Sequence, residues 1–312
     1  MSGGAARWRA AAADSAAWRK IGRTTVGARL FRSTAYASAD LVRRRVTAGI
    51  EAARRRQRYS TVEAFLVFIG HTKSGGSLVG AMLDAHARAL VSDEIDVVRY
   101  TEAGFRRGQI LALVERGSIR ESMKGRVTAR RLESYSLAVD GQYQGASHAP
   151  LVMGDSRAGP TTRALGDDPG KLARLRATFE GLPLRFIHVV RDPIGPMSAM
   201  MIRSGRTAEN AIEDYFAQCD RLMWLVPQLG ESVFRVHYED LVADPRGLLT
   251  GICRFVGLEP TVDYLNACGT LIDGDRVSEA AQISWSPAQI DEIRRRSTAY
   301  PFLSRYVDEV GR

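Results

Sequence analysis

The stretch Phe65–His86 holds the residues of this chain that are best suited to chemistry. It begins with an unbroken apolar run, Phe65–Ile69, which is typical of a strand buried on both faces. A segment rich in glycine and hydroxyl groups follows, Gly70–Ser77, with a single cation at Lys73. Apolar residues then recur at helical spacing. A strand, a glycine-rich turn and a helix in this order form a cradle for an anion, because backbone N–H groups and the positive end of the helix converge there.

The cradle departs from the Walker A pattern, in which a glycine, any four residues, and then Gly-Lys-Ser/Thr follow one another. Gly70 and Gly75 have the required spacing and Ser77 falls in place, but Gly76 stands where the lysine belongs. The lysine is found three positions earlier, at Lys73, so it enters the cradle from the strand side. The alternative is an ordinary tight turn between a strand and a helix, and the composition of the loop favours anion binding over it.

The elements that must position this loop alternate along the chain. Five apolar segments read as strands, and the stretches between them carry helical periodicity, which predicts an α/β fold: a three-layer parallel β-sheet with helices on both faces. The expected strands are 65–69, 89–91, 151–155, 184–190 and 232–236. The expected helices begin after the loop, span 100–116, start near Thr161, span 207–229, and start at Asp244-Pro245.

Charged side chains follow several of these expected strands directly. In parallel sheets, ligands bind at the carboxyl ends of the strands, so residues just after the strand ends are expected to share one site. The residues in this position are Lys73, Glu94, Asp155, Arg157 and Arg191. The polar, basic segment 117–150 is expected to be an excursion that covers the mouth of this site.

Arg191 follows its strand immediately and precedes Asp192-Pro193, where a guanidinium can hold an anion bidentately. A loop with its lysine at Lys73, followed later by strand-Arg-Asp-Pro, resembles the layout of sulfotransferases that use PAPS (3′-phosphoadenosine 5′-phosphosulfate). A later stretch, Tyr238-Glu239-Asp240-Leu241 with Asp244-Pro245, resembles one common in that family, and the resemblance covers about 64–305. Two further stretches, Asp84-Ala85-His86 and Trp285-Ser286-Pro287, look like those of its bacterial branch.

The resemblance implies a P-loop NTPase-like sulfotransferase fold and a set of cofactor-binding residues. The 5′-phosphosulfate would be bound by Lys73, Ser74, Gly75, Gly76 and Ser77, and the 3′-phosphate by Arg191. Two positions depart from the family pattern. The first of two expected hydroxyl residues after the loop glycine is Gly76, and the serine expected eight residues after Arg191 is replaced by Ala199, with Ser198 as the nearby hydroxyl.

Sulfuryl transfer needs charge neutralisation at the leaving oxygen and removal of a proton from the acceptor. Lys73 suits the first task, and no metal is required because a phosphosulfate carries less charge than a nucleoside triphosphate. Four residues compete for the role of base, and we choose Glu94, which follows the second strand. The others are His71 inside the cradle, which is also suited to contact the sulfuryl group, His86 on the loop helix, and Asp155. Asp155, Arg157 and His86 are also candidates for contact with the acceptor.

The function expected on this resemblance is transfer of a sulfuryl group from PAPS, with PAP as product, to a hydroxyl or amine of a small molecule, lipid or glycan. A phosphate-loop kinase is the alternative that shares the sheet and the loop. A kinase of this type requires a lysine at the position that Gly76 occupies. A third reading is a non-enzymatic protein that binds membranes or nucleic acid through its basic N-terminal arm.

The net positive charge of the chain comes from that arm. Residues 1–58 carry 14 Lys and Arg against 3 Asp and Glu, whereas the remaining residues carry 30 against 32. A nucleic-acid-binding surface over the whole body is therefore not expected. For the arm, a solvated or disordered tail is the first reading, and the alternatives are an amphipathic helix that lies on anionic lipid or a partner, and an organelle transit peptide. We expect a basic arm over 1–60 and a sulfotransferase domain over 61–312. The three scattered cysteines predict no disulfide framework and fit a cytoplasmic protein, with peripheral membrane attachment left open.

Overall fold

A computed structural model of the chain describes residues 34–93, 95–127, 136–272 and 283–307, with side chains from residue 38 onward. The chain divides into two compact units, residues 1–50 and 51–312. The described part of the first unit is the N-terminal portion of helix α3 (Thr34–Arg54), which continues into the second unit. Within the described ranges, no helix combines the length and the apolar character needed to cross a bilayer.

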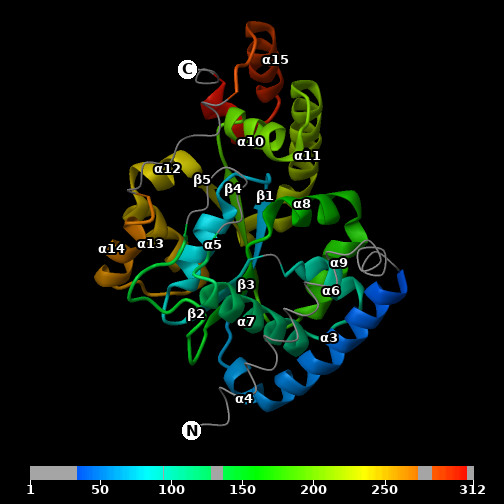
Figure 1. Cartoon of the computed structure of the whole chain (residues 1–312), viewed down its shortest axis with the longest axis vertical. Coiled ribbons are helices and arrows are strands. Elements are labelled where there is room, and N and C mark those ends of the chain that lie inside the picture. Colours follow the sequence, from blue (N-terminus) through cyan, green and yellow to red (C-terminus); the bar gives the residue numbers. More distant parts are fainter. Residues whose placement is uncertain (1–33, 94, 128–135, 273–282, 308–312) are drawn as a thin grey trace. The chain divides into compact units, whose positions relative to one another are not determined.

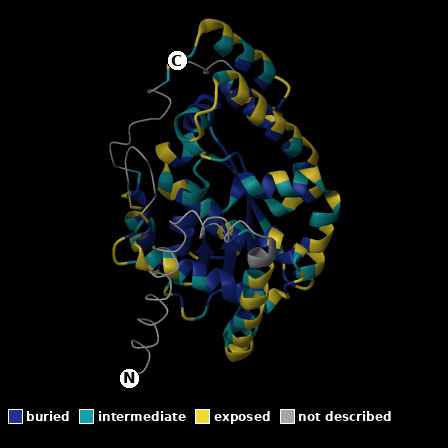
Figure 2. Cartoon of the chain, turned by 45° about the vertical axis from the view of Figure 1, so that its right-hand side comes forward, coloured by how far each residue is buried: buried dark blue, intermediate teal, exposed yellow. Residues whose placement is uncertain are grey.

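The second unit is built on a five-stranded sheet in the order β2-β3-β1-β4-β5 (Figure 1). Every neighbouring pair is parallel, so the carboxyl ends of all five strands lie at one edge. Strand β1 is central and buried along its whole length, as the unbroken apolar run predicts (Figure 2). The strands are β1 (Ala64–Gly70), β2 (Ala89–Ser92), β3 (Val152–Asp155), β4 (Leu184–Val190) and β5 (Val233–His237).

Helices cover both faces of the sheet, so the predicted three-layer α/β fold is confirmed (Figure 1). On one face, α5 (Gly76–Asp84), α13 (Pro245–Val256) and α14 (Val262–Gly269) share a core with the sheet. On the other face, α8 (Ala158–Asp167) and α11 (Ala208–Leu229) approach the end of β1. The remaining elements are α4 (Arg56–Tyr59), α6 (Val97–Glu102), α7 (Arg107–Met123), α9 (Pro169–Thr178), α10 (Ile194–Ser204), α12 (Tyr238–Ala243), α15 (Pro287–Ser297), η1 (Gly230–Ser232) and η3 (Pro301–Tyr306).

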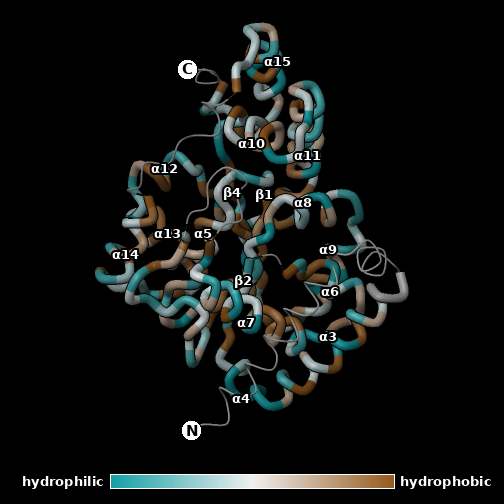
Figure 3. Tube along the Cα trace, viewed as in Figure 1, coloured by the Kyte–Doolittle hydropathy of each residue, from teal (hydrophilic) through white to brown (hydrophobic). Residues whose placement is uncertain are grey.

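Helix α13 illustrates how the sequence produces this packing. Leu249, Ile252, Cys253 and Val256 recur at helical spacing and are all buried, while Arg246 and Arg254 are exposed, so the helix carries both hydrophobic and hydrophilic residues (Figure 3). The helix begins at Pro245, a residue suited to the first helical turn, and the Asp244 side chain accepts a hydrogen bond from the N–H of Gly247. The start predicted at Asp244-Pro245 is therefore confirmed.

Two expectations about the segment after β2 need correction. The expected single helix over 100–116 is two helices, α6 and α7, because Gly104 between them adopts a positive φ of 72° that interrupts helical geometry. Helix α7 also continues to Met123, into the segment expected to be an excursion.

The described part of the excursion 117–150 is hydrogen-bonded to the loop helix. The Gln144 side chain donates to the carbonyl of Ala81, and the N–H of Tyr143 donates to the carbonyl of Ala85. Both acceptors lie toward the C-terminal end of α5, and this helix runs away from the loop at its start. These described residues therefore pack against the far end of the loop helix, and Leu137 and Val139 nearby in the chain are buried.

Candidate functional site

The glycine-rich loop leaves the sheet at the end of β1, and two helices of one face fix that point. The N–H of Gly70 donates to the Thr162 hydroxyl on α8 at 2.8 Å, and the Gln218 side chain on α11 donates to the Gly70 carbonyl. Gly70 has a φ of 130°, and a Cβ there would lie 2.4 Å from the carbonyl oxygen of Val189 on β4. Only glycine fits this turn, which explains the residue at the strand end.

Beyond Gly70, the loop backbone contains two further residues with positive φ, Lys73 at 73° and Gly75 at 103°. A lysine in the left-handed region is uncommon and stores strain, and such strain is concentrated at functional sites. Helix α5 begins directly afterwards, at Gly76, and the first N–H groups of a helix have no carbonyl one turn earlier to bond to. The loop therefore presents backbone donors, the helix's positive end and the exposed Lys73 side chain together.

One loop hydroxyl has the properties of a ligand donor. Ser74 is 1% exposed, and its Oγ has no hydrogen-bond partner among the described residues. An unsatisfied buried hydroxyl is destabilising, so a group that binds there gains a donor that is already desolvated. This donor, with the N–H groups of the α5 start and the cation at Lys73, suits an anion such as a phosphosulfate.

Arg191 lies beside this loop. Its Nη1 donates to the Lys73 carbonyl at 3.4 Å, and its guanidinium lies over the Tyr238 ring, 4.3 Å from the centroid. The same ring packs on the loop, because a Cβ at Gly75 would lie 2.6 Å from Tyr238 Cδ2. Tyr238 thus supports both the loop and the guanidinium, a role that its place in the Tyr-Glu-Asp-Leu stretch did not reveal.

The backbone after Arg191 is tied to α12. The N–H of Asp192 donates to Glu239 Oε1 at 3.0 Å, and the Asp192 carboxylate accepts from the N–H of Ile194 at 2.7 Å. Burial raises the pKa of Asp192 to about 6, and the neighbouring Glu239 carboxylate adds to this rise. Hydrogen bonds at the N–H and at the carboxylate of Asp192 therefore hold the Arg-Asp-Pro turn in place.

The described residues of the acidic segment 93–96, which follows β2, form the other side of the site. The Asp155 carboxylate accepts from the N–H groups of Ile95 and Val97, both at 3.1 Å, and burial raises the pKa of Asp155 to about 6. Arg157 pairs with Asp96 at 2.9 Å. Asp155 and Arg157, both predicted as substrate-contacting residues, therefore bind the residues of this acidic segment. Both carboxylate oxygens of Asp155 accept hydrogen bonds from its backbone.

Within that segment, Glu94, the predicted base, lies outside the described residues. Its neighbour Asp93 lies next to the loop, because Asp93 Oδ1 accepts from Ser77 Oγ at 3.3 Å and from Ser156 Oγ at 3.1 Å. Sequence reasoning missed Asp93. Its position immediately after β2 was the available signal, since it is shared with the residues that were chosen.

His71 needs correction as a group in the cradle. Its Nε2 donates to the Tyr215 carbonyl at 3.1 Å, and its ring stacks on that of Tyr215 with centroids 3.8 Å apart. Burial lowers the pKa of His71 to about 4. The side chain is turned toward α11 and stays neutral, which is unsuited to contact with an anionic sulfuryl group.

His86 also lies elsewhere, beyond the C-terminal end of α5. Its Nε2 donates to the Glu259 carbonyl at 3.1 Å, and its ring meets the edge of the Tyr264 ring. Nine helical residues separate the two ends of α5, which places His86 roughly 14 Å from the loop. A contact between His86 and a substrate at the loop is contradicted by this placement.

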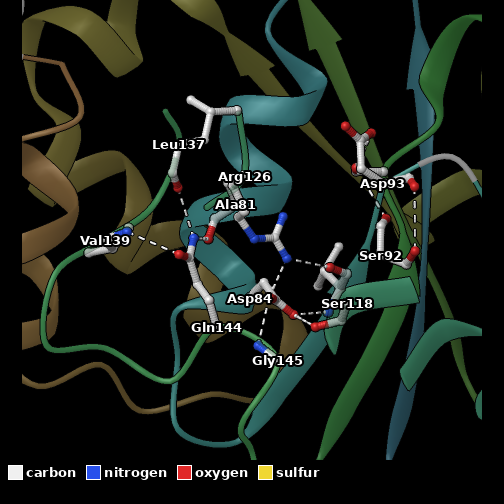
Figure 4. A network of polar contacts seen from close by, with 12 residues as sticks. Ala81, Asp84, Ser92, Asp93, Ser118, Arg126, Leu137, Val139, Gln144 and Gly145 are labelled. Atoms are coloured by element: carbon white, nitrogen blue, oxygen red, sulfur yellow. Dashed lines mark hydrogen bonds and ion pairs between the residues drawn. The ribbon is translucent and has the colours of Figure 1, made fainter. Parts of the chain in front are cut away.

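Asp84, two residues earlier, anchors this end of the loop helix (Figure 4). The carboxylate is fully buried and accepts from the N–H of Val91, from Ser118 Oγ, from the Arg126 guanidinium and from the N–H of Gly145. These donors join α5 to β2, to α7 and to both described ends of the excursion. The Asp-Ala-His stretch that contributed to the resemblance is thus structural at both of its polar residues.

Ser198, named for the 3′-phosphate, lies on α10 and is fully buried. Its Oγ accepts from Trp285 Nε1 at 3.0 Å. A serine hydroxyl that accepts this bond keeps its own proton to donate. Among the described residues, no group of three or more His, Cys, Asp or Glu side chains is arranged to hold a metal ion.

Comparison with known proteins gives a family for this arrangement. Residues 66–263 match the family model described as the sulfotransferase family. No curated protein shows a significant sequence match to the chain.

Three of the similar solved structures are the sulfotransferase domain from the Synechococcus PCC 7002 olefin synthase, sulfotransferase STF9 from Mycobacterium avium, and mouse sulfotransferase SULT7A1 complexed with PAP. The first is 20% identical over 80% of this chain and 94% of its own, with a TM-score of 0.45. The second is 10% identical over 85% and 81%, also with a TM-score of 0.45. The third is 13% identical over 79% and 89%, with a TM-score of 0.46. The family assignment rests on the family model alone.

Proposed function

The chain belongs to the sulfotransferase family, and we propose that it transfers a sulfuryl group from PAPS to a hydroxyl or amine acceptor. The observation that carries the proposal is the adjacency of two anion anchors, in which Arg191 Nη1 lies 3.4 Å from the Lys73 carbonyl. A donor with anionic groups at both its 5′ and 3′ positions suits such a pair of anchors better than a donor with one.

At the 5′ end, the loop would hold the phosphosulfate. Lys73 would neutralise charge that develops on the leaving oxygen, and the N–H groups at the start of α5 would bind the equatorial oxygens. Ser74 and Ser77 would add hydroxyl donors. The single hydroxyl proton of Ser77 is donated to Asp93. When PAPS binds, Ser77 would donate this proton to the anion in place of Asp93.

At the 3′ end, Arg191 would bind the phosphate bidentately, as a guanidinium fork does with planar pairs of oxygens. Ser198 would donate its own proton to the same phosphate, since its Oγ is the acceptor in the bond with Trp285 Nε1. The Tyr238 ring beneath Arg191 would keep the guanidinium in one orientation.

On the acceptor side, we propose Glu94 as the base, with the acidic segment held by Asp155 and Arg157 as its support. Asp155 and His71 are less suited, because the first has committed both oxygens to backbone N–H groups and the second is turned toward Tyr215. The acceptor would be a small molecule, a lipid or a glycan.

We also propose that the basic arm, residues 1–60, contacts an anionic membrane surface while the domain 61–312 performs transfer in the cytoplasm. Helix α3 supports this, because the exposed side chains of Val42, Val46 and Ile50 recur every four residues and arginines flank them. Such a stripe with basic borders is typical of helices that lie on anionic lipid.

A kinase remains the alternative to test. Calorimetric titration with PAP, beside titration with ATP and magnesium, separates the two. We expect PAP to bind and ATP with magnesium to bind far more weakly, because the Walker lysine position holds Gly76. Binding of ATP with magnesium and no response to PAP would place the kinase first.

A further inference from the structure

The Glu239 carboxylate joins the end of the described chain to the turn that carries Arg191. Its Oε1 accepts from the N–H of Asp192 at 3.0 Å, and its Oε2 accepts from the Tyr306 hydroxyl on η3. One oxygen of Glu239 thus bonds to the turn and the other to Tyr306. Glu239 is therefore the link between Tyr306 and the peptide group next to Arg191.

The Tyr306 hydroxyl has no freedom to turn elsewhere. Tyr306 is 1% exposed, and His237 Nδ1 lies 3.0 Å from its oxygen. Because the single proton of the hydroxyl goes to Glu239, His237 must carry its proton on Nδ1 and donate. The chain of donors thus runs in one direction, from His237 through Tyr306 to Glu239.

A second link between the same two segments is weaker. Arg305 Nη1 lies 2.8 Å from both carboxylate oxygens of Asp240, but both side chains are largely exposed, at 38% and 48%. Exposed ion pairs contribute little to stability, because water screens them. The buried hydrogen bond from Tyr306 to Glu239 therefore contributes more than the ion pair to joining the two segments.

The two residues that open α12 both act on the arginine. The Tyr238 ring lies under the guanidinium, and the neighbouring Glu239 binds the N–H of the residue that follows Arg191. A chain of contacts thus runs from Tyr306 through the start of α12 to the guanidinium. A bidentate contact to a phosphate tolerates little misalignment.

We propose that Tyr306 is a positioning residue for the 3′-phosphate anchor, and that it gives the site its preference for a nucleotide phosphorylated at the 3′ position. The inference rests on the proposed function, in which Arg191 binds that phosphate. It assigns a specificity role to a residue that lies 115 positions beyond the arginine in the chain.

The test compares two nucleotides on the full chain by calorimetric titration. PAP carries the 3′-phosphate, and adenosine 5′-phosphosulfate lacks it. In Tyr306→Phe we expect PAP to bind about tenfold more weakly while the affinity for adenosine 5′-phosphosulfate is unchanged, because the variant keeps the ring and loses the bonds of the hydroxyl to Glu239 and His237.

Tyr300→Phe is the matched control. It removes a hydroxyl from the residue just before η3, and that hydroxyl bonds to Asp220 on α11 at 2.7 Å, away from Arg191. Its preference for PAP should equal that of the wild type. Glu239→Gln, which weakens the same link from the other side, should reproduce the loss seen in Tyr306→Phe.

Two outcomes overturn the inference: unchanged PAP affinity in Tyr306→Phe, or equal losses for both nucleotides, which would indicate general damage. A wild-type protein that does not bind PAP would instead count against the proposed function, so the two failures are distinguishable.

Discussion

Arg191 Nη1 donates to the carbonyl of Lys73 at 3.4 Å, although 118 residues separate them in the chain. The contact follows from the sheet order, because β1 and β4 are parallel neighbours and both residues follow the ends of these strands. The two positive side chains that the sequence places far apart thus belong to one site. This relationship supports the proposal of a donor with two anionic ends.

The hydroxyl missing from the loop can be restored. A Cβ at Gly76 would lie 3.4 Å from the Ser156 carbonyl oxygen and 3.6 Å from Ala158 Cβ, which are ordinary contacts. In Gly76→Ser we expect PAP to bind about tenfold more tightly, because one more hydroxyl can donate to a charged group. Calorimetric titration of both proteins measures the change.

Gly80→Ser is the control for that gain. It adds the same group one turn later on α5, but its Cβ would lie 2.5 Å from Ser156 Cβ, so the protein should lose stability without gaining affinity. If Gly76→Ser bound PAP no better than the wild type, the loop hydroxyls would not contribute to binding.

The stability of the protein should carry a pH signature of Asp155. Burial raises its pKa from 3.8 to about 6, so between about pH 4 and pH 6 the native state holds a proton that the unfolded chain has released. This contribution makes the free energy of unfolding fall as the pH rises through that window. Asp155→Asn removes it, so the stability of the wild type relative to the variant should decrease from pH 4 to pH 6.

Urea unfolding of both proteins at the two ends of this window gives the comparison. Asp192, whose pKa is also raised to about 6, is present in both proteins, and its effect cancels in the difference. A stability difference that does not change with pH would contradict the assignment of the raised pKa to Asp155.

The buried pair Asp84 and Arg126 should dominate the stability of the loop helix. Asp84→Ala leaves the guanidinium buried at 5% side-chain exposure without its carboxylate, and we expect a loss of about 3–5 kcal/mol in the free energy of unfolding. Denaturant unfolding monitored by circular dichroism measures it.

Glu213→Ala, which breaks the pair of Glu213 with Arg296 at a carboxylate that is 68% exposed, should cost less than about 1 kcal/mol. Comparable losses in the two variants would show that burial does not set the importance of the Asp84 network.

Much of the fold could be predicted because its signals are local. The strand 184–190 was predicted with the bounds of β4, and the loop was recognised because glycine, lysine and hydroxyl groups stand together in sequence. The C-terminal limit of α7 was missed, since this half of the helix buries Gly117 and Ser118 in place of an apolar stripe.

The site was predicted where a residue directly follows a strand and was missed where a side chain's direction decides its role. His71 lies in the loop, but its ring turns toward Tyr215, and no spacing rule indicates that. The contribution of Tyr306 depends on a bond to Glu239 across 67 positions, which local sequence does not carry.

The measurement that tests the central claim most directly is calorimetric titration of PAP into the wild type, Lys73→Ala and Arg191→Ala. Arg246→Ala, which removes an exposed arginine on α13, is the matched control. We predict binding in the micromolar range for the wild type and the control, and a loss of about hundredfold in each anchor variant, because each removes a cation paired with a bound anion. PAP affinity that is unchanged in both anchor variants would contradict the account, since the two anchors would then not hold the donor.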